Sequence, residues 1–434
     1  MFGYYFDLAL RSLRRNIALT ALMVLAVALG IGASMTTLTV LHVLSGDPVP
    51  GRSAQLYHPQ IDPLDASGYQ PGQTQPPDQV TWIDGMNLLR ARRADRQALM
   101  TGGQVAVQPG NTMLDPFYEA ARYTTADFFP MFGVPLAYGR AWNAADDEAS
   151  ARVAVISAAL NTRLFGGKDS TGQSLRLSGT AFRIIGVLGD WHPNPQFYDL
   201  SRKSYGQSEG VYVPLSTSQD LGMTQQGRVD CWGNGGSGKN PSHTGLCVWL
   251  QFWVQLDPSA APAYKAFLVD YSAQQKALGR FQRPPNVQLR NVTQWLDFNQ
   301  VVPDDVRLQT WLAFGFLLVC LVNMMGLMLA KFMRRSGELG VRRALGASRR
   351  ALFAQLLIDS GVIGLVGGVG GLLLALFGLW LVRRQPAEYA ALAHLDLAML
   401  VSTFVLALGA SLLAGLLPAW RACQIAPALQ LKTN

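Results

Sequence analysis

Four long stretches of apolar residues constrain the fold of this chain more than any other feature. In chain order the stretches are residues 17–44, 308–330, 351–382 and 397–420; charged residues are absent from all but the third, which contains one ionisable residue, Asp359. A helix rises about 1.5 Å per residue, so a helix built from any of these stretches is longer than the ~30 Å hydrocarbon core of a bilayer. The sequence therefore predicts four transmembrane helices.

A secretory signal peptide is the alternative for the first stretch, because Arg11, Arg14 and Arg15 precede it. The stretch is about twice as long as the 7–15 residues that are usual for the apolar part of a signal peptide, and no clear cleavage site closes it. We therefore expect an uncleaved membrane anchor.

Basic residues indicate the orientation of the four helices. They gather before the first stretch, between the second and third, and after the fourth, where Arg421 and Lys432 lie. Four crossings put these three groups on one side, which is the cytoplasmic side because Lys and Arg are enriched there. Arg383 and Arg384 fall on the outer side and are outnumbered. The net charge of +8 is thus largely a topology signal and does not indicate nucleic-acid binding.

The long segment between the first two apolar stretches is predicted to be an α+β domain outside the cytoplasm. Its first part is rich in proline and glycine, which disfavour regular structure. Apolar periodicity then predicts helices over residues 80–100 and 262–278, and strands over residues 152–156, 174–178 and 182–188. Strands mixed with a few helices are typical of an α+β fold.

These observations predict the following layout. In chain order it comprises a cytoplasmic or interfacial amphipathic helix (1–16), the first membrane helix (17–44), the extracytoplasmic domain (45–306), the second membrane helix (307–331), a cytoplasmic loop (332–350), the third membrane helix (351–382), a short outer loop (383–396), the fourth membrane helix (397–420) and a cytoplasmic tail (421–434).

Two of the four cysteines, Cys231 and Cys247, lie in the outer domain. In an oxidising compartment an isolated pair favours a disulfide, which would close a loop of about 15 residues and stabilise the domain by up to roughly 3 kcal/mol. Two reduced, buried thiols are the alternative. Cys320 and Cys423 are expected to remain free.

The sequence predicts neither a catalytic nor a metal site. Residues 233–240 resemble a phosphate-binding loop, but Asn240 replaces the required Ser or Thr and Pro241 follows, so a flexible glycine loop is favoured. The five histidines are scattered without metal-ligand spacing. The acidic residues 146–148 are interpreted as a solvated turn.

The third apolar stretch contains two features that need an explanation. An acid such as Asp359 is costly in a membrane and favours a functional role, but it lies only about 13 Å of helix beyond Arg350 and could reach polar surroundings. Both interpretations stay open. The glycine pairs Gly364/Gly368 and Gly367/Gly371 have the spacing that permits close packing of helices.

Three groups of motifs resemble the MacB/FtsX-type permeases of ABC transporters. The most specific is Glu338-Leu-Gly-Val-Arg-Arg-Ala-Leu-Gly-Ala347, followed by residues 355–359 and the glycine-rich helix. The others are Pro418-Ala-Trp-Arg421 and, in the outer domain, residues 128–140, 153–157, 164–167, 172–176 and 185–188.

The resemblance implies a fold of one helix, a large outer domain and three further helices. It also implies that the segment from Glu338 to Ala347 seats on a nucleotide-binding subunit. The residues expected there are Glu338, Leu339, Gly340, Arg342, Arg343, Leu345, Gly346 and Ala347, with the leucines as apolar and the arginines as charged contacts.

Two features depart from the family pattern. The tail has Pro427-Ala-Leu-Gln-Leu where the family commonly has Pro-x-Glu-Ala-Leu-Arg, and the N-terminal ATPase domain of MacB has no counterpart. We therefore expect a non-enzymatic chain without a cofactor of its own, with ATP and magnesium bound by a separate ATPase.

The expected function is coupling of ATP hydrolysis to movement of the outer domain, driving efflux across the bacterial inner membrane. Expected partners are the ATPase, a second permease subunit in a homodimer or heterodimer, membrane lipid, and a periplasmic adaptor with an outer-membrane channel, but no nucleic acid. The alternatives are signalling to a cell-wall hydrolase, extraction of lipoproteins, and a membrane-anchored ligand receptor without an ATPase.

Overall fold

The computed structural model describes residues 17–110, 114–202, 204–206, 208–235, 245–385, 394–395 and 397–424. The expected helix over residues 1–16, most of the glycine loop, most of the short outer loop and the tail beyond residue 424 lie outside the described residues. The chain divides into two compact units. Residues Gly46–Val301 form the outer domain, and the segments before and after it form a helix bundle.

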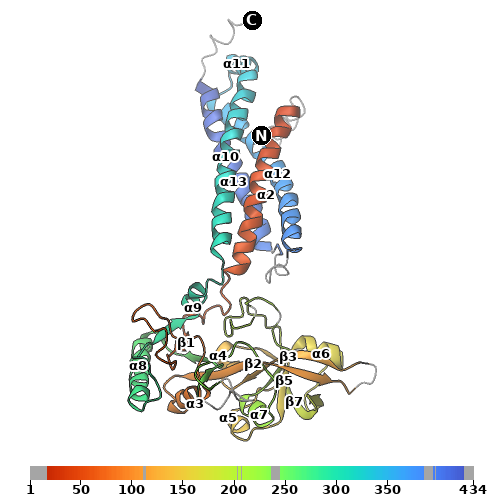
Figure 1. Ribbon diagram of the computed structural model, residues 1–434. Coiled ribbons are helices and arrows are strands. Elements are labelled where there is room, and N and C mark those ends of the chain that lie inside the picture. Colours follow the sequence, from red (N-terminus) through yellow and green to blue (C-terminus); the bar gives the residue numbers. More distant parts are fainter. Residues whose placement is uncertain are drawn as a thin grey trace. The chain divides into compact units, whose positions relative to one another are not determined.

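Four long helices make up the bundle: α2 (Ile17–Leu44), α10 (Asp304–Arg334), α12 (Arg349–Val382) and α13 (Leu397–Gln424) (Figure 1). All four are long and apolar enough to cross a membrane. Helices α2 and α13 each pack against both α10 and α12. The prediction of four membrane helices is confirmed.

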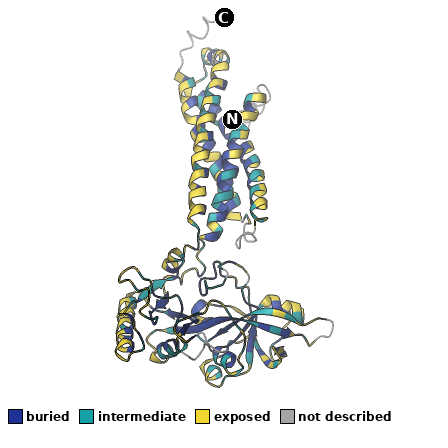
Figure 2. Ribbon diagram, viewed as in Figure 1, coloured by how far each residue is buried: buried dark blue, intermediate teal, exposed yellow. Residues whose placement is uncertain are grey.

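The outer surface of the bundle is apolar. Side chains such as Leu312, Leu318 and Val405 are more than 60% exposed, and Figure 2 shows exposed positions along the length of the helices. Exposed leucine and valine at this density suit contact with lipid chains. The acidic pair Asp304 and Asp305 occupies the first turn of α10, where the positive end of the helix dipole favours negative charge.

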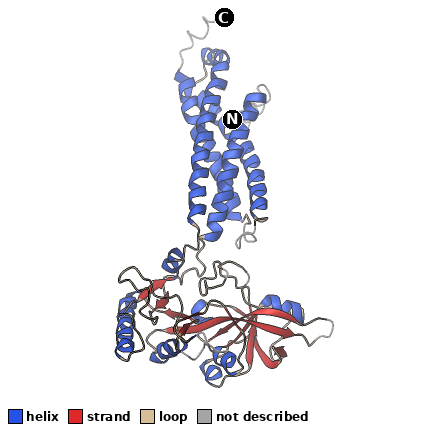
Figure 3. Ribbon diagram, viewed as in Figure 1, coloured by secondary structure: helices blue, strands red, loops and turns tan. Residues whose placement is uncertain are grey.

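One 11-stranded mixed sheet forms the centre of the outer domain, and Figure 3 shows the helices around it. Its main strand order is β13-β1-β12-β2-β3-β8-β5-β7-β4, while β6 pairs with β2 and β7, and β9 pairs with β2. The strands are β1 (Leu56–Gln60), β2 (Arg96–Gln108), β3 (Phe117–Thr124), β4 (Leu136–Gly139), β5 (Val153–Ile156), β6 (Ser174–Leu177), β7 (Thr180–Leu188), β8 (Val211–Pro214), β9 (Gln225–Gln226), β12 (Gln251–Gln255) and β13 (Gln288–Asn291).

The helices of this domain are short except for α8. They are α3 (Trp82–Ala91), α4 (Phe128–Phe132), α5 (Ala144–Glu148), α6 (Ala158–Phe165), α7 (Leu215–Asp220), α8 (Ala261–Ala277) and α9 (Val292–Phe298). The α+β class is confirmed, and β5, β6, β7 and α8 lie where strands and a helix were predicted.

The predicted helix over residues 80–100 is wrong in its second half. Helix α3 stops at Arg92, which adopts the left-handed conformation (φ 47°) and donates its N–H to the carbonyl of Leu89. Strand β2 then begins at Arg96 and pairs with β12 on one side and β3 on the other. Pairing with distant segments on both edges overrides the local helical pattern.

Alternation along β2 builds the core of the outer domain. Leu99 belongs to one buried apolar cluster, whereas its neighbours Ala98 and Met100 belong to a second one. Successive side chains of a strand point to opposite faces, so the two clusters cover the two faces of the sheet.

Cys231 and Cys247 are joined by a disulfide. They sit directly opposite each other in a small two-stranded sheet, β10 (Asp230–Cys231) and β11 (Cys247–Val248). Cys320 and Cys423 are free and buried. The structure therefore contains the expected bond and the two expected thiols.

Candidate coupling site

The basic loop between α10 and α12 folds as a short helix, α11 (Ser336–Ala344). Its end is set by backbone hydrogen bonds from Ala347 N–H to Arg342 C=O (3.0 Å) and from Gly346 N–H to Arg343 C=O (3.1 Å). This arrangement is a Schellman motif, and Gly346 has φ +98°, a conformation that favours glycine. Ser348 then caps α12 by accepting the N–H of Ala351.

The outward face of α11 is apolar. Val341 is 49% exposed and Leu345 is 83% exposed, and the two lie four residues apart, on one face of the helix. The side chain of Leu339 lies outside the described part of the structure, and Gly340 is buried. Val341 is thus a second exposed apolar residue beside Leu345, and sequence reasoning missed it.

The inward face of α11 is held by charged side chains. Arg335 Nε lies 3.5 Å from Glu338 Oε2, and Arg342 Nη2 lies 3.3 Å from Glu338 Oε1. Arg342 also donates to Gln355 Oε1 of α12 (3.0 Å), and Arg343 donates to the carbonyl of Cys423 in α13 (3.4 Å). The two arginines expected to face a partner therefore contact this chain's own helices.

Asp359 lies in an ion cluster at the end of the bundle next to α11. Its Oδ2 is 3.4 Å from Arg335 Nη1 and 3.7 Å from Lys331 Nζ, and the Asp359 and Lys331 side chains are almost fully buried. The polar surroundings considered for Asp359 are thus supplied by α10 and by the start of α11. Sequence reasoning missed Lys331 and Arg335, although Lys331 directly ends the second apolar stretch.

The two glycine pairs of α12 face different neighbours. A Cβ atom on Gly368 would lie 2.8 Å from Ala407 Cβ of α13, and one on Gly364 would overlap Ser411 of the same helix. A Cβ on Gly367 or Gly371 would instead lie 2.7 Å from Val27 Cγ1 or 2.9 Å from Ile31 Cγ2 of α2. The glycines therefore let α12 approach α2 and α13 closely.

The outer domain contains a buried ion cluster around Arg122. Its guanidinium contacts Glu209 and donates to Asp199 Oδ2 (2.6 Å), and all three side chains are at most 3% exposed. Burial pushes the pKa of Asp199 upward, but the Arg122 charge and hydrogen bonds from Ser201 hold it below its ordinary value. Nothing in the local sequence marks this cluster, because Arg122 is 77 and 87 residues from its partners.

His58 occupies the core beside this cluster. Its ring stacks on Trp295 with centroids 4.1 Å apart and meets the edge of Trp253. Burial lowers the pKa of His58 to about 3, so the imidazole is neutral at physiological pH. This histidine is a packed core residue.

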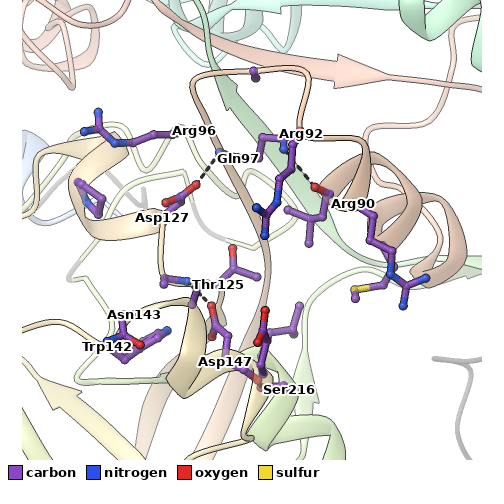
Figure 4. A pocket seen from close by; sticks show the side chains of 18 of the residues that line it. Arg90, Arg92, Arg96, Gln97, Thr125, Asp127, Trp142, Asn143, Asp147 and Ser216 are labelled. Atoms are coloured by element: carbon purple, nitrogen blue, oxygen red, sulfur yellow. Dashed lines mark hydrogen bonds between the residues drawn. The ribbon is translucent and has the colours of Figure 1, made fainter.

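A cleft of about 1180 Å³ lies among α3, α5 and α7 (Figure 4). Trp82, Met86 and Leu89 of α3 line it together with Trp142 and Asp147. The Asp147 carboxylate accepts the N–H of Ala126 (2.7 Å), and burial raises its pKa to about 7. Asp147 is thus partly withdrawn from solvent, whereas Glu148 is exposed, and the acidic segment 146–148 belongs to the short helix α5 instead of the turn that was expected. Within the described residues no cluster of side chains could hold a metal ion.

Two family models match the chain. The MacB-like periplasmic core domain matches residues 20–266, and the FtsX-like permease C-terminal domain matches residues 311–427. The first match contains nearly all of α2 and most of the outer domain. The second contains α11, α12, α13 and most of α10.

Individual proteins of known name are also similar to this chain in sequence. The pyoverdine export ATP-binding/permease protein PvdT of Pseudomonas aeruginosa is 23% identical over 371 residues, covering 85% of this chain and 50% of the relative. The macrolide export ATP-binding/permease protein MacB of Rhodospirillum rubrum is 26% identical over 443 residues, covering 100% and 61%. The chain therefore spans about half to three fifths of the length of these relatives.

A solved structure that is similar to part of this chain is the periplasmic region of MacB from Actinobacillus actinomycetemcomitans. It shares 15% sequence identity with a TM-score of 0.37, over 58% of this chain and 95% of that chain.

Proposed function

Since the chain belongs to the MacB/FtsX-type family of ABC transporter permeases, we propose that it couples ATP hydrolysis by a nucleotide-binding subunit to movement of its outer domain, driving efflux. In this proposal the chain is a non-catalytic subunit of the bacterial inner membrane, and the outer domain lies in the periplasm. ATP and magnesium bind to the ATPase subunit.

The observation that carries the proposal is the geometry of α11. Its outward face exposes Val341 and Leu345, which a partner surface can bury, and its inward face is joined by Arg342 and Arg343 to α12 and α13. A partner that displaces α11 therefore pulls on two membrane helices at once. Burial of one exposed apolar side chain at an interface contributes about 1 to 3 kcal/mol, enough to make Leu345 an anchor.

Efflux is the proposed outcome because the relatives include proteins named for export. In this proposal a second permease subunit completes the transport path, since four helices leave little room for a pore. The remaining proposed partners are a periplasmic adaptor and an outer-membrane channel.

The test is purification of the tagged full chain from membranes of its native host, with the co-purifying proteins identified by mass spectrometry. We expect an ATPase subunit in stoichiometric amount with the wild type and its loss with Val341→Asp/Leu345→Asp. Leu278→Asp is the matched control, because Leu278 of the outer domain is 73% exposed yet lies far from α11 in the sequence. Absence of an ATPase from the wild type, or its retention by the double variant, contradicts the proposal.

A further inference from the structure

We infer that Asp359 is a positioning residue that fixes the joint between α10 and the coupling helix α11 against α12. The inference rests on the proposed coupling function and deepens it, since it names the group that makes α11 and α12 move together. Its basis is one buried carboxylate that contacts the last turn of α10 and the first residue of the turn into α11.

Both ends of α11 are breaks in the helical backbone. Arg335 ends α10 and precedes α11, and Gly346 reverses the chain with a positive φ. A helix between two such joints can pivot unless side chains restrain it. The stiffness of the connection between α11 and the bundle therefore depends on side-chain contacts.

Those contacts form a closed circuit between α11 and α12. It runs from Asp359 to Arg335 (3.4 Å), from Arg335 to Glu338 (3.5 Å), from Glu338 to Arg342 (3.3 Å) and from Arg342 to Gln355 (3.0 Å). Gln355 and Asp359 are four residues apart and so lie on one face of α12. Attachment at two successive turns prevents α11 from rotating about a single contact.

Asp359 is the most deeply placed member of this circuit. Its side chain is 4% exposed, whereas the Glu338 and Arg342 side chains are about one third exposed. Exposed ion pairs exchange readily with water, but a buried pair is held because separation would strand its charges in an apolar medium. Lys331, with a fully buried side chain, adds a second cation to the same carboxylate. The contacts of Asp359 are therefore the fixed part of the circuit, whereas the more exposed contacts of Glu338 and Arg342 can rearrange.

Three variants separate positioning from stability. Asp359→Asn leaves the buried ammonium of Lys331 without its ion partner and destabilises the fold. Lys331→Met/Asp359→Leu removes both buried charges, so the fold recovers stability while the ion pair between Arg335 and Asp359 is still lost. Asp359→Glu keeps the carboxylate and should preserve the circuit.

The first measurement is the distance distribution between spin labels on Leu345→Cys and Trp420→Cys in the full chain. Both positions are exposed, and Cys320 and Cys423 are replaced by alanine in this background. We expect a narrow distribution in the wild type and in Asp359→Glu, and a broad one in Lys331→Met/Asp359→Leu. Asp305→Asn, which removes an exposed carboxylate from α10, is the control and should remain narrow.

The second measurement uses the complex with the ATPase subunit. Lys331→Met/Asp359→Leu should retain the ATPase, because the outward face of α11 is unchanged, while the permease-dependent part of the ATPase rate falls about fivefold or more. A distribution as narrow as that of the wild type, or an unchanged rate, overturns the role of Asp359. If the wild type binds no ATPase, the proposed function is wrong. The role of Asp359 in positioning α11 is then decided by the spin-label distances alone.

Discussion

Gly364 of α12 lies directly against Ser411 of α13. A Cβ atom added to Gly364 would be 2.5 Å from the Cβ of Ser411 and 3.0 Å from the carbonyl oxygen of Ala407. Neither neighbouring atom is the end of a flexible side chain. The two helices can therefore approach this closely only because position 364 has no side chain.

Gly364→Ala should destabilise the bundle by about 1 to 3 kcal/mol, because one helix has to move to admit the methyl group. Thermal unfolding of the detergent-solubilised full chain measures the effect. Gly409→Ala in α13 is the matched control, since a Cβ there meets no atom within 4 Å. Equal melting temperatures for the two variants would contradict the packing described.

Arg122→Met should destabilise the outer domain by about 3 to 5 kcal/mol, because the buried carboxylates of Asp199 and Glu209 lose their shared cation. Chemical denaturation followed by tryptophan fluorescence measures the loss. Arg140→Ala is the control. Its pair with Asp146 (3.2 Å) joins an arginine side chain that is 59% exposed, so its removal should cost less than about 1 kcal/mol. A loss no larger for Arg122→Met than for the control would count against the buried cluster.

Asp147 should make the outer domain less stable as the pH rises. Its pKa is raised from the ordinary 3.8 to about 7, so between these values the folded state binds more protons than the unfolded state. Stability from this group is fully present below about pH 4 and is lost by about pH 7, with a change of up to about 4 kcal/mol.

Asp147→Asn tests this, because the amide oxygen can still accept the N–H of Ala126. The difference in unfolding free energy between variant and wild type should move in favour of the variant from pH 5 to pH 8. Asp146→Asn is the control. The hydrogen bond from the Asn143 N–H lowers the pKa of Asp146, so the stability that this carboxylate contributes to the fold is lost only as the pH falls. A pH-independent difference for Asp147→Asn would exclude the raised pKa.

The disulfide predicts the thiol count of the protein. Denatured, unreduced chain should show two reactive thiols, from Cys320 and Cys423, and reduced chain should show four. Cys231→Ser/Cys247→Ser should lower the stability of the outer domain by about 3 kcal/mol, since the open loop gains entropy in the unfolded state. Four thiols before reduction would show that the bond does not form in the cell.

Several elements of this structure follow from short-range sequence patterns. The membrane helices are recognisable because every residue of a crossing segment meets an apolar medium, so the requirement is repeated along the chain from residue 17 to residue 44 and in the three later stretches. The pairs Gly364/Gly368 and Gly367/Gly371 likewise predict close helix packing from their spacing alone. The helix assigned to residues 96–100 failed because β12 and β3, which hold that segment as a strand, lie elsewhere in the sequence.

The sequence by itself thus determined the four membrane helices, the large domain inserted after the first of them, and the basic segment between the second and the third. Only the tertiary structure decided that Asp359 meets Lys331, 28 positions earlier, and that Arg122 meets Asp199 and Glu209. The physical reason is that each residue of a membrane helix must individually suit an apolar environment, and this requirement produces a pattern that can be recognised in the sequence. A long-range ion pair exists only where folding brings two residues distant in sequence within about 4 Å, and no local sequence pattern predicts which residues will pair.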